Sequence, residues 1–411
     1  MIQSPRDTPL KDIRVIDLTR VLAGPYATLI LGDLGAEVIK IERPGNGDDS
    51  RAFGPFLEGE SLYFMSLNRN KKSVVLDLRL EKGKELFKKL VEVSDVVVEN
   101  FRPGVMDKLG LGYDVLKKIN SRIIYVACSG FGQTGPYRGL PAYDMIVQAM
   151  GGVMSITGER DGSPVRVGTS IGDITAGLFT AIGVFSALRA RDLIGEGQMV
   201  DVGMMDCQVA ILENAIVRYF ATGEVPKPLG SRHPSIVPFE AFKSKDGYVV
   251  IAIGNDGFWS RFCSVINKPE LACDSDFQTN DLRVENYTKL KPIIDQIVVQ
   301  KTTDEWVQLL QTNGIPCCAI NTIDKVFYNE QVKARDMIVE VEHPTAGKIK
   351  IPGIPIKLSN TPGSIRSPAP LYGQHTREVL CNLLEISTED LEELNRQGVI
   401  QDYAMKCTLK D

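Results

Sequence analysis

Five short apolar runs recur between residues 14 and 127, and they constrain the fold more than any other feature of the sequence. They are rich in valine and isoleucine, and they lie at Arg14–Leu18, Glu37–Ile41, Ser73–Leu78, Asp95–Glu99 and Arg122–Ala127. Strands of this kind belong inside a parallel sheet that is covered on both faces. Because helix-compatible segments separate them, the sequence predicts a doubly wound α/β domain.

The clearest intervening helix is predicted over Glu81–Val93, where apolar residues recur at helical spacing and lysines occupy the opposite face. A longer helix is predicted over Ile174–Ala190, and because this segment is apolar almost all round we expect it to be buried. Further helices are predicted over Tyr26–Leu34, Tyr113–Ile119 and Met204–Thr222.

The character of the chain changes after residue 222. Residues 223–235 carry three prolines and two glycines, a composition typical of a linker. Beyond it, Phe239–Ile253 is typical of a hairpin that turns at Lys245-Asp246-Gly247, and helices follow to about residue 310. The middle of the chain therefore predicts a smaller α+β unit. A second hairpin is predicted over Met337–Lys357, and Ser387 is placed to cap a final helix.

Composition excludes several classes of function. Forty-seven basic against 52 acidic side chains give a net charge of -5, which argues against a nucleic-acid partner or a polybasic membrane anchor. The most apolar stretch, Gly177–Leu188, is shorter than the roughly 20 residues that span a bilayer. The start of the sequence lacks a signal-peptide pattern, and the eight cysteines form no C-x-x-C pair. With only three histidines, we expect a cytoplasmic protein without a metal centre and without a membrane partner.

Two segments imitate a dinucleotide site. Residues 14–42 copy a Rossmann strand–helix–strand unit, but the turn holds only Gly24 where three glycines are expected. Gly130–Gly135 matches G-x-G-x-x-G, yet Pro136 and Pro141 follow at once, so no helix is expected to begin there. An NAD(P)-dependent oxidoreductase built on residues 14–42 remains an alternative.

Six motifs, in order along nearly the whole chain, resemble the class III CoA-transferases, the family of formyl-CoA transferase and the carnitine CoA-transferases. They are DLTRVLAGPYATLILGDLGAEVIKIERP (17–44), NRNKKSVVLDL (68–78), VENFRPG (98–104), GFGQTGP (130–136), PAYD (141–144) and GDITAG (172–177). Residues 230–250 and 342–353 are most similar to the branch of the family that exchanges CoA between succinate and glutarate.

The resemblance implies an interlocked homodimer in which both ends of each chain build a large Rossmann-like domain. On this chain the large, CoA-binding domain would comprise residues 1–222 together with the returning segment 336–411. Residues 223–335 would supply the linkers, expected near 223–235 and 320–336, and the small α+β domain.

The resemblance also implies that Asp173 is the nucleophile. By itself, an aspartate just before a long apolar helix is commonly an N-cap, and that reading stays open beside the catalytic one. Both readings place the carboxylate at a helix N-terminus, which stabilises negative charge. The implied reaction is of the ping-pong type, proceeds through aspartyl anhydrides and an aspartyl-CoA thioester, and needs no cofactor beyond coenzyme A as substrate and product.

The family's CoA contacts fall on a set of loop positions, among which Arg43 is the best candidate partner for a CoA phosphate. Lys108 stands where an arginine is usual in the family, which keeps the charge but loses the bidentate fork. The full set is Val21, Leu22, Arg43, Leu76, Asp77, Leu78, Arg79, Asn100, Phe101, Arg102, Lys108, Pro141, Ala142, Tyr143 and Asp144.

Tyr143 and Asp144 fall where the family places groups beside the thioester. The related acyl-CoA racemases, a second alternative, have a histidine at the position of Tyr143, and a tyrosine with a pKa of about 10 is a poor substitute in proton exchange. A CoA-binding protein without catalytic activity is a third alternative.

The residues Arg232, His233 and Ser235 offer a cation, an imidazole and a hydroxyl beside the linker. A second carboxylate on the substrate needs such partners, because burying it unpaired costs several kcal/mol. We therefore expect acyl-CoA and small carboxylic acids as partners, with succinyl-CoA as donor and a C4–C6 dicarboxylate as acceptor. In the alternative reading, Arg232 merely pairs with a surface acid.

Overall fold

The computed structural model describes residues 8–403, which divide into two compact units. The first unit contains the chain up to residue 153, residues 166–221 and the chain from 333 onward. The second contains residues 154–165 and 222–332. Residues 154–165, which the sequence analysis assigned to the large domain, thus belong to the second unit. Each unit has its own hydrophobic core.

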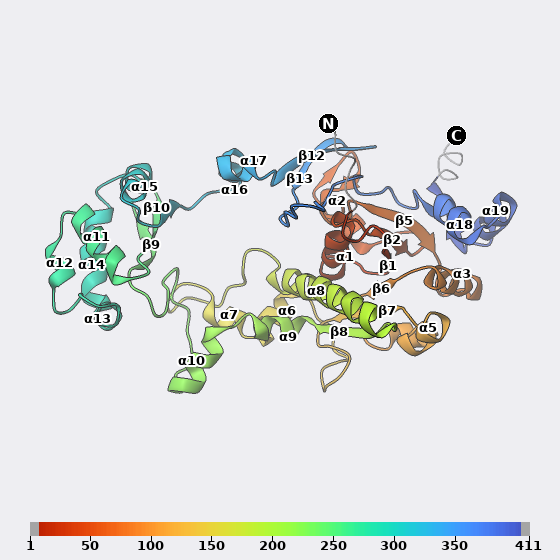
Figure 1. The fold of residues 1–411 in the computed structure, drawn as a ribbon, viewed down its shortest axis with the longest axis horizontal. Helices are drawn as coiled ribbons and strands as arrows, with labels where there is room; N and C mark the ends of the chain where they lie inside the picture. The colour runs from red at the N-terminus through yellow and green to blue at the C-terminus, as the bar shows by residue number, and fades with distance from the viewer. Residues whose placement is uncertain (1–7, 404–411) are drawn as a thin grey trace. The chain divides into compact units, whose positions relative to one another are not determined.

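A seven-stranded sheet lies at the centre of the first unit, with strand order β14-β5-β2-β1-β6-β7-β8 (Figure 1). All neighbouring strands pair in parallel except β14, which runs antiparallel to β5 at one edge. The chain builds outward from β1 to one side and then from β6 to the other, so the sheet is doubly wound. This arrangement confirms the predicted α/β class. The strands are β1 (Arg14–Asp17), β2 (Glu37–Glu42), β5 (Lys71–Leu76), β6 (Val96–Glu99), β7 (Ile124–Ser129), β8 (Met199–Gly203) and β14 (Ile400–Gln401).

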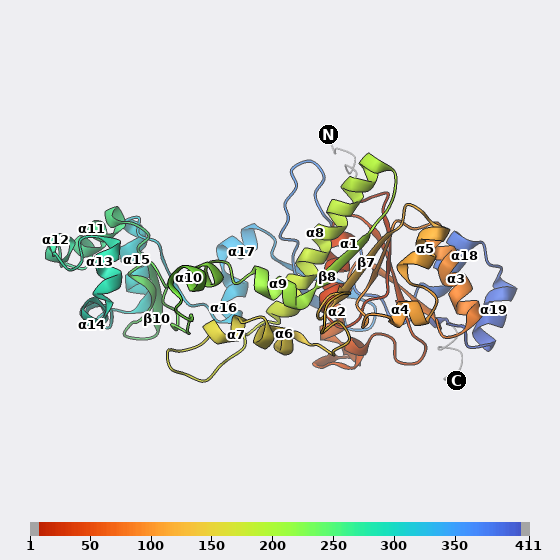
Figure 2. The same cartoon turned by 90° about the horizontal axis from the view of Figure 1, so that it is seen from below.

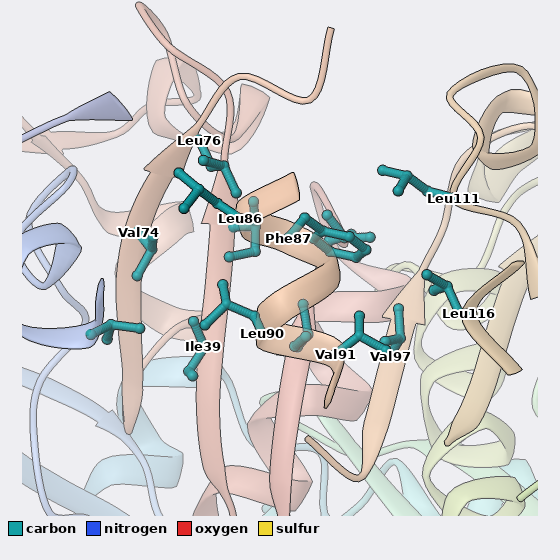
Figure 3. Close-up of a cluster of buried hydrophobic side chains, with 14 of the residues drawn as sticks. Ile39, Val74, Leu76, Leu86, Phe87, Leu90, Val91, Val97, Leu111 and Leu116 are labelled. Carbon is teal, nitrogen blue, oxygen red and sulfur yellow. The ribbon is translucent and has the colours of Figure 1, made fainter. Parts of the chain in front are cut away.

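Helices cover both faces of the sheet. On one face, α1 (Ala23–Asp33) and α8 (Ile171–Ile194) lie side by side, as Figures 1 and 2 show. The other face is covered by α3 (Glu81–Glu92), α5 (Tyr113–Ile119), α18 (Thr376–Leu384) and α19 (Thr388–Arg396). Figure 3 shows how α3 turns its predicted apolar face, including Leu86, Phe87 and Leu90, onto the sheet.

Helix α8 is long and apolar enough, by length and composition alone, to cross a membrane. About half of its most apolar stretch is buried inside the protein, and it packs against α1, β7 and β8. Gly177 allows the close approach to α1, because a Cβ atom there would lie 2.7 Å from the carbonyl oxygen of Ala23. These contacts bury part of α8 in the first unit, but Leu178, Phe179 and Ile182 are exposed, so the expectation that the whole helix is buried is only half met.

The structure differs from the sequence expectations at several elements. The helix predicted over 204–222 is two helices, α9 (Met204–Ala210) and α10 (Asn214–Thr222), and Glu213 between them has a positive φ of 38°. The expected linker 320–336 contains α16 (Ile323–Tyr328) and α17 (Glu330–Ala334). As expected, no helix begins after Gly130 until α6 (Asp144–Met150), and Ser387 caps α19.

The smaller elements of the first unit complete its surface, and β12 and β13 form the second predicted hairpin. They are η1 (Asp49–Ala52), β3 (Phe56–Leu57), β4 (Glu60–Ser61), α2 (Leu62–Leu67), α4 (Val105–Lys108), β12 (Ile338–His343) and β13 (Gly347–Pro352). The chain crosses between the units at four points: within α7 (Val153–Ile156), after residue 165, at the end of α10 and within α17.

The second unit packs helices on a three-stranded antiparallel sheet of order β11-β10-β9. Trp259, Phe262 and Trp306 fill its core, and the fully buried Arg283 donates to the carbonyl oxygens of Val237 and Phe277. The elements are β9 (Phe239–Lys243), β10 (Tyr248–Ala252), α11 (Asp256–Val265), α12 (Glu270–Cys273), α13 (Asn280–Glu285), α14 (Tyr287–Val298), α15 (Thr303–Thr312) and β11 (Cys317–Ala319).

Candidate active site

The loops after β1 and β6 meet where the direction of the chain across the sheet switches. In open α/β sheets, ligands bind in the crevice at the carboxyl ends of the strands at this point. Asn100 joins the two loops, since its side chain accepts the Arg20 backbone N–H at 2.8 Å and donates to the Arg20 carbonyl at 2.8 Å. The crevice is therefore built by the fold itself.

A first pocket of about 290 Å³ opens at the ends of β1, β2 and β5. Six aliphatic side chains and three arginines are among the residues that line it, a combination that suits a nucleotide base together with its phosphates. Six of the residues predicted to bind CoA line it, namely Arg43, Leu76, Asp77, Leu78, Arg79 and Phe101.

A second pocket of about 260 Å³ contains Asp173. It shares Arg20 and Phe101 with the first pocket, so the two lie side by side within the first unit. Its walls include eight of the residues predicted to bind CoA, namely Val21, Leu22, Asn100, Phe101, Arg102, Pro141, Ala142 and Tyr143.

Two predicted residues line neither pocket. Lys108 is exposed at the end of α4, whose first residue Val105 does line the first pocket. Asp144 is buried, and both of its carboxylate oxygens are engaged by the protein: Oδ1 accepts the Gly172 backbone N–H at 2.8 Å and Oδ2 accepts Gln148 Nε2 at 2.7 Å. Asp144 therefore caps the start of α8 from a distant part of the chain.

This arrangement corrects the N-cap reading of Asp173. Helix α8 begins at Ile171, so Asp173 is its third residue, while the N-cap position is held by Ser170 without a side-chain cap. The carboxylate lies in the first turn, where the helix dipole favours negative charge. Burial, with a smaller contribution from the nearby Asp144 carboxylate, nevertheless raises the pKa of Asp173 to about 7. The group can thus be protonated or ionised near neutral pH.

Tyr63, which no sequence motif marked, lies within electrostatic reach of Asp173. Burial raises the pKa of Tyr63 to about 12, and the Asp173 carboxylate is the largest of the charges that add to this shift. Tyr63 is the second residue of α2, some 110 positions before Asp173 in sequence. Only the packing of the first unit brings the phenol and the carboxylate together.

A buried ion pair supports the turn that lines the second pocket. Val21 has a positive φ of 69°, a conformation that a β-branched residue rarely adopts. Its backbone N–H donates to Asp48 Oδ1 at 3.1 Å, and Asp48 Oδ2 lies 2.8 Å from Lys40 Nζ with both side chains fully buried. Although burial opposes ionisation, the Lys40 ammonium holds the pKa of Asp48 well below its usual range. The pair fixes the strained turn against β2.

Two arginines converge on one carboxylate beside the first pocket. Arg20 Nη1 lies 3.1 Å from Asp49 Oδ2, and Arg43 pairs with the other oxygen of Asp49. Arg20 also lies over the Phe101 ring, 5.0 Å from its centroid. The cluster carries one net positive charge at the border of the two pockets. Of these two arginines, only Arg43 was expected from the sequence to bind CoA.

Arg232, His233 and Ser235 belong to the second unit, in the segment before β9. His233 Nδ1 accepts the Ser235 backbone N–H at 3.1 Å, so the proton of the neutral imidazole is on Nε2. Within residues 8–403, no carboxylate lies within 4 Å of the Arg232 guanidinium, which instead lies over the Tyr287 ring at 3.7 Å. Within the described residues Arg232 thus makes no close ion pair with a surface acid, although its charge lowers the pKa of the buried Glu240 carboxylate, which burial raises.

Comparison with known proteins gives one consistent result. The family model described as CoA-transferase family III matches residues 10–376. The chain is 43% identical over 399 residues to succinyl-CoA:glutarate CoA-transferase of Mus musculus, which covers 97% of this chain and 92% of that protein. It is 41% identical over 387 residues to succinate–glutarate CoA-transferase of Agrobacterium fabrum, covering 92% of this chain and 96% of the relative.

The resemblance extends to acetyl-CoA:oxalate CoA-transferase of Acetobacter aceti, 44% identical over 352 residues, with 85% of this chain and 89% of the relative covered. Among solved structures, a CAIB/BAIF family protein from Brucella suis superposes with a TM-score of 0.82 at 39% identity, covering 92% of this chain and all of that chain.

Proposed function

The chain belongs to CoA-transferase family III, and from that premise we propose that it moves coenzyme A from succinyl-CoA to a free dicarboxylic acid. The observation that carries the proposal is the position of Asp173 in a pocket that shares walls with a nucleotide-sized pocket at the switch point. The names of the relatives support the substrate class, because they include glutarate, oxalate, citramalate and mesaconate transferases.

In the proposed mechanism, the Asp173 carboxylate attacks the thioester carbonyl of succinyl-CoA. The carbon–sulfur bond breaks, which gives a succinyl–aspartyl anhydride and CoA thiolate. The thiolate then attacks the aspartyl carbonyl, releasing succinate and leaving an aspartyl-CoA thioester on the enzyme. The acceptor carboxylate attacks that thioester to form a second anhydride and thiolate. The thiolate then attacks the acceptor's carbonyl in this anhydride, which gives the new acyl-CoA and releases the Asp173 carboxylate. Each step exchanges one activated acyl group for another, so charge balances without a net proton transfer.

The surrounding residues serve this chemistry by position. The first pocket would hold the nucleotide of CoA, with Arg43 and Arg20 near its phosphates. Asp144 holds the start of α8 through Gly172, the residue before the nucleophile, and its charge keeps the pKa of Asp173 high. A carboxylate with a raised pKa is a stronger nucleophile once it is ionised.

The test of the nucleophile is Asp173→Ala, which should abolish transfer while leaving CoA binding nearly intact. Hydroxylamine added with acyl-CoA should inactivate the wild type by trapping the aspartyl thioester. Asp192→Ala, at the exposed far end of the same helix, is the matched control and should keep full activity. Appreciable turnover by Asp173→Ala would show that another group is the nucleophile.

We propose that the acceptor's second carboxylate is bound by Arg232, with His233 and Ser235 beside it. The support is chemical: the segment offers a guanidinium, an imidazole and a hydroxyl, and the Arg232 guanidinium lies over the Tyr287 ring while its charge acts on Glu240 without a close ion pair in residues 8–403. Glutarate should therefore be a better acceptor than butyrate, which is glutarate without its second carboxylate. Equal acceptor efficiency in the wild type would contradict this assignment.

We also propose an interlocked homodimer that acts in the cytoplasm with no cofactor beyond coenzyme A. Exposed apolar side chains support the dimer, because helices α6, α8 and α10 each expose several side chains that a monomer would normally bury. They are Met145, Ile146, Met150, Leu178, Phe179, Ile182, Val217 and Phe220. Neither a racemase nor an NAD(P)-dependent oxidoreductase is favoured by the relatives, which are named as CoA-transferases.

A further inference from the structure

The loop that follows β2 forms one wall of the first pocket, to which it contributes Arg43, Pro44 and Gly47. Two of its residues, Gly45 and Gly47, have positive φ angles of 90° and 66°. Glycine adopts such angles without steric cost, but it also loses more conformational freedom on folding than any other residue. Within the loop, Arg43 Nε donates to the Gly47 carbonyl at 3.2 Å. A glycine-rich wall of this kind needs contacts from outside the loop to keep one shape.

Those contacts come from the C-terminal segment that returns to the first unit. The Tyr372 hydroxyl donates to the carbonyl oxygen of Arg43, 329 positions away in sequence, at 3.0 Å, and it also lies 2.8 Å from Gln401 Oε1. Gln401 Oε1 in turn accepts the Gly45 N–H at 3.3 Å. The Tyr372 ring packs on Gly47, where a Cβ atom would lie 2.9 Å from Cδ2 of the ring. Tyr372 and Gln401 thus contact the loop at three positions.

Tyr372 is itself held from both sides along the chain. Arg51 Nη2 donates to the Pro370 carbonyl at 3.2 Å, and the Gly373 N–H donates to Ser73 Oγ on β5 at 2.8 Å. Burial raises the pKa of Tyr372 to about 12, so its hydroxyl keeps the proton that it donates. The position of this hydroxyl therefore depends on the sheet and not on a ligand.

We propose that Tyr372 is a positioning residue for the nucleotide of coenzyme A: its hydroxyl holds the backbone of Arg43, and with it one wall of the first pocket, in place before the nucleotide binds. This role rests on the proposed function, because it presupposes that the first pocket holds the nucleotide. None of the CoA contacts expected from the sequence lies in the returning segment. A wall that is ordered in advance removes a cost that a mobile loop would incur on binding.

The test separates the nucleotide of CoA from the rest of the reaction. It measures kcat/KM for succinyl-CoA, kcat and KM for glutarate, and, by calorimetry, the Kd of adenosine 3′,5′-bisphosphate. This fragment carries the adenosine and two phosphates of CoA but lacks the thioester arm. The variants are Tyr372→Phe, Arg43→Ala and the double variant. Tyr248→Phe, at an exposed tyrosine on β10, is the matched control, and thermal unfolding shows whether each variant is folded.

Tyr372→Phe keeps the ring and removes only the hydroxyl. It should lower kcat/KM for succinyl-CoA about fivefold and raise the Kd of the bisphosphate by about the same factor, as expected for one lost hydrogen bond. The values of kcat and of KM for glutarate should change less than about twofold, because the nucleotide is held equally in the ground and transition states of that half-reaction. Tyr248→Phe should match the wild type.

Arg43→Ala should lower kcat/KM for succinyl-CoA roughly 10- to 100-fold, because a charge-assisted contact to a phosphate is lost. In the double variant the loss should be smaller than the product of the two single effects, since Tyr372 acts through Arg43. Single effects that multiply fully would show that the hydroxyl does not act through Arg43.

The inference would be overturned if Tyr372→Phe left both succinyl-CoA kinetics and bisphosphate binding unchanged, or lowered kcat/KM equally for succinyl-CoA and glutarate. A kinetic loss without a change in the Kd of the bisphosphate would also overturn it, as would a wild type that does not bind the bisphosphate. Failure of the proposed function is recognised separately, because the wild type would then transfer no CoA from succinyl-CoA to any acid, whatever the calorimetry shows.

Discussion

Replacing the proposed nucleophile by its neutral isostere, Asp173→Asn, should stabilise the protein while it abolishes activity. The pKa of Asp173 is about 7 in the folded chain and 3.8 in an ordinary, solvated aspartate. As pH rises from 4 to 7 the unfolded chain therefore loses this proton first, and the folded state is progressively disfavoured. Above pH 7 the cost of holding the charge in the fold is constant.

The magnitude follows from the difference of about 3 pKa units at 1.36 kcal/mol each. The substitution should raise the free energy of unfolding by about 4 kcal/mol at pH 8. At pH 5 the gain should be only about 2 kcal/mol, because this pH lies only about one unit above the ordinary pKa of an aspartate and ionisation favours the unfolded chain less. The gain should continue to shrink below pH 5. Function is thus held at the expense of stability, as is common in active sites.

The assay is denaturant unfolding of wild type and variant at pH 5 and pH 8, at one protein concentration. Asp304→Asn is the control, because Asp304 is an exposed aspartate in the first turn of α15. It should change stability by less than about 1 kcal/mol, and in the opposite direction, since it removes a favourable charge near a helix N-terminus. A stability gain that is independent of pH, or a loss at pH 8, would refute the reasoning.

Four further outcomes are expected. The value of kcat/KM for succinyl-CoA should rise with pH through about 7, as Asp173 ionises. Asp144→Asn should move this rise to lower pH. An unmoved profile would show that the Asp144 charge does not act on Asp173. Lys40→Met should cost about 3–5 kcal/mol in denaturant unfolding, because it leaves the buried Asp48 carboxylate unpaired, and adding Asp48→Asn should recover part of the loss. CoA should raise the melting temperature by mass action whereas NADH should not, and the reverse pattern would favour an oxidoreductase. Sedimentation at nanomolar concentration should show a dimer, and a folded monomer there would contradict the interlocked assembly.

Much of the fold could be predicted because periodicity is local. The Val- and Ile-rich runs are apolar on both faces, and they form the central strands of the sheet with valines paired across it, as at Val15, Val38 and Val96. Helix α3 turns its predicted face to the core, and α5 has its predicted bounds. In contrast, the first three residues of β8 are exposed or half-exposed, and β14 is only two residues long. Strands this short or polar are defined by the partner they join rather than by their own residues.

In the candidate site, too, some features could be predicted from the sequence and others could not. The family motifs could be read from the sequence, and Asp173 and most of the residues that they predicted to bind CoA line one of the two pockets. The start of α8 was placed at residue 174 because an aspartate before an apolar helix has the pattern of an N-cap. The helix begins at Ile171 because Asp144, from α6, accepts the Gly172 N–H in place of a local cap.

The sequence by itself thus determined the α/β class and the family, and it supplied the proposal that Asp173 is the nucleophile, because each of these inferences depends on residues that are neighbours in the sequence. Only the tertiary structure brought Tyr63 near Asp173, joined Arg20 to Arg43 through Asp49, and placed Tyr287 under Arg232. The reason is physical: repeat spacing and motifs act over a few residues, whereas a pKa, a shared counter-ion or a stacked guanidinium depends on groups that only chain folding brings within a few ångströms.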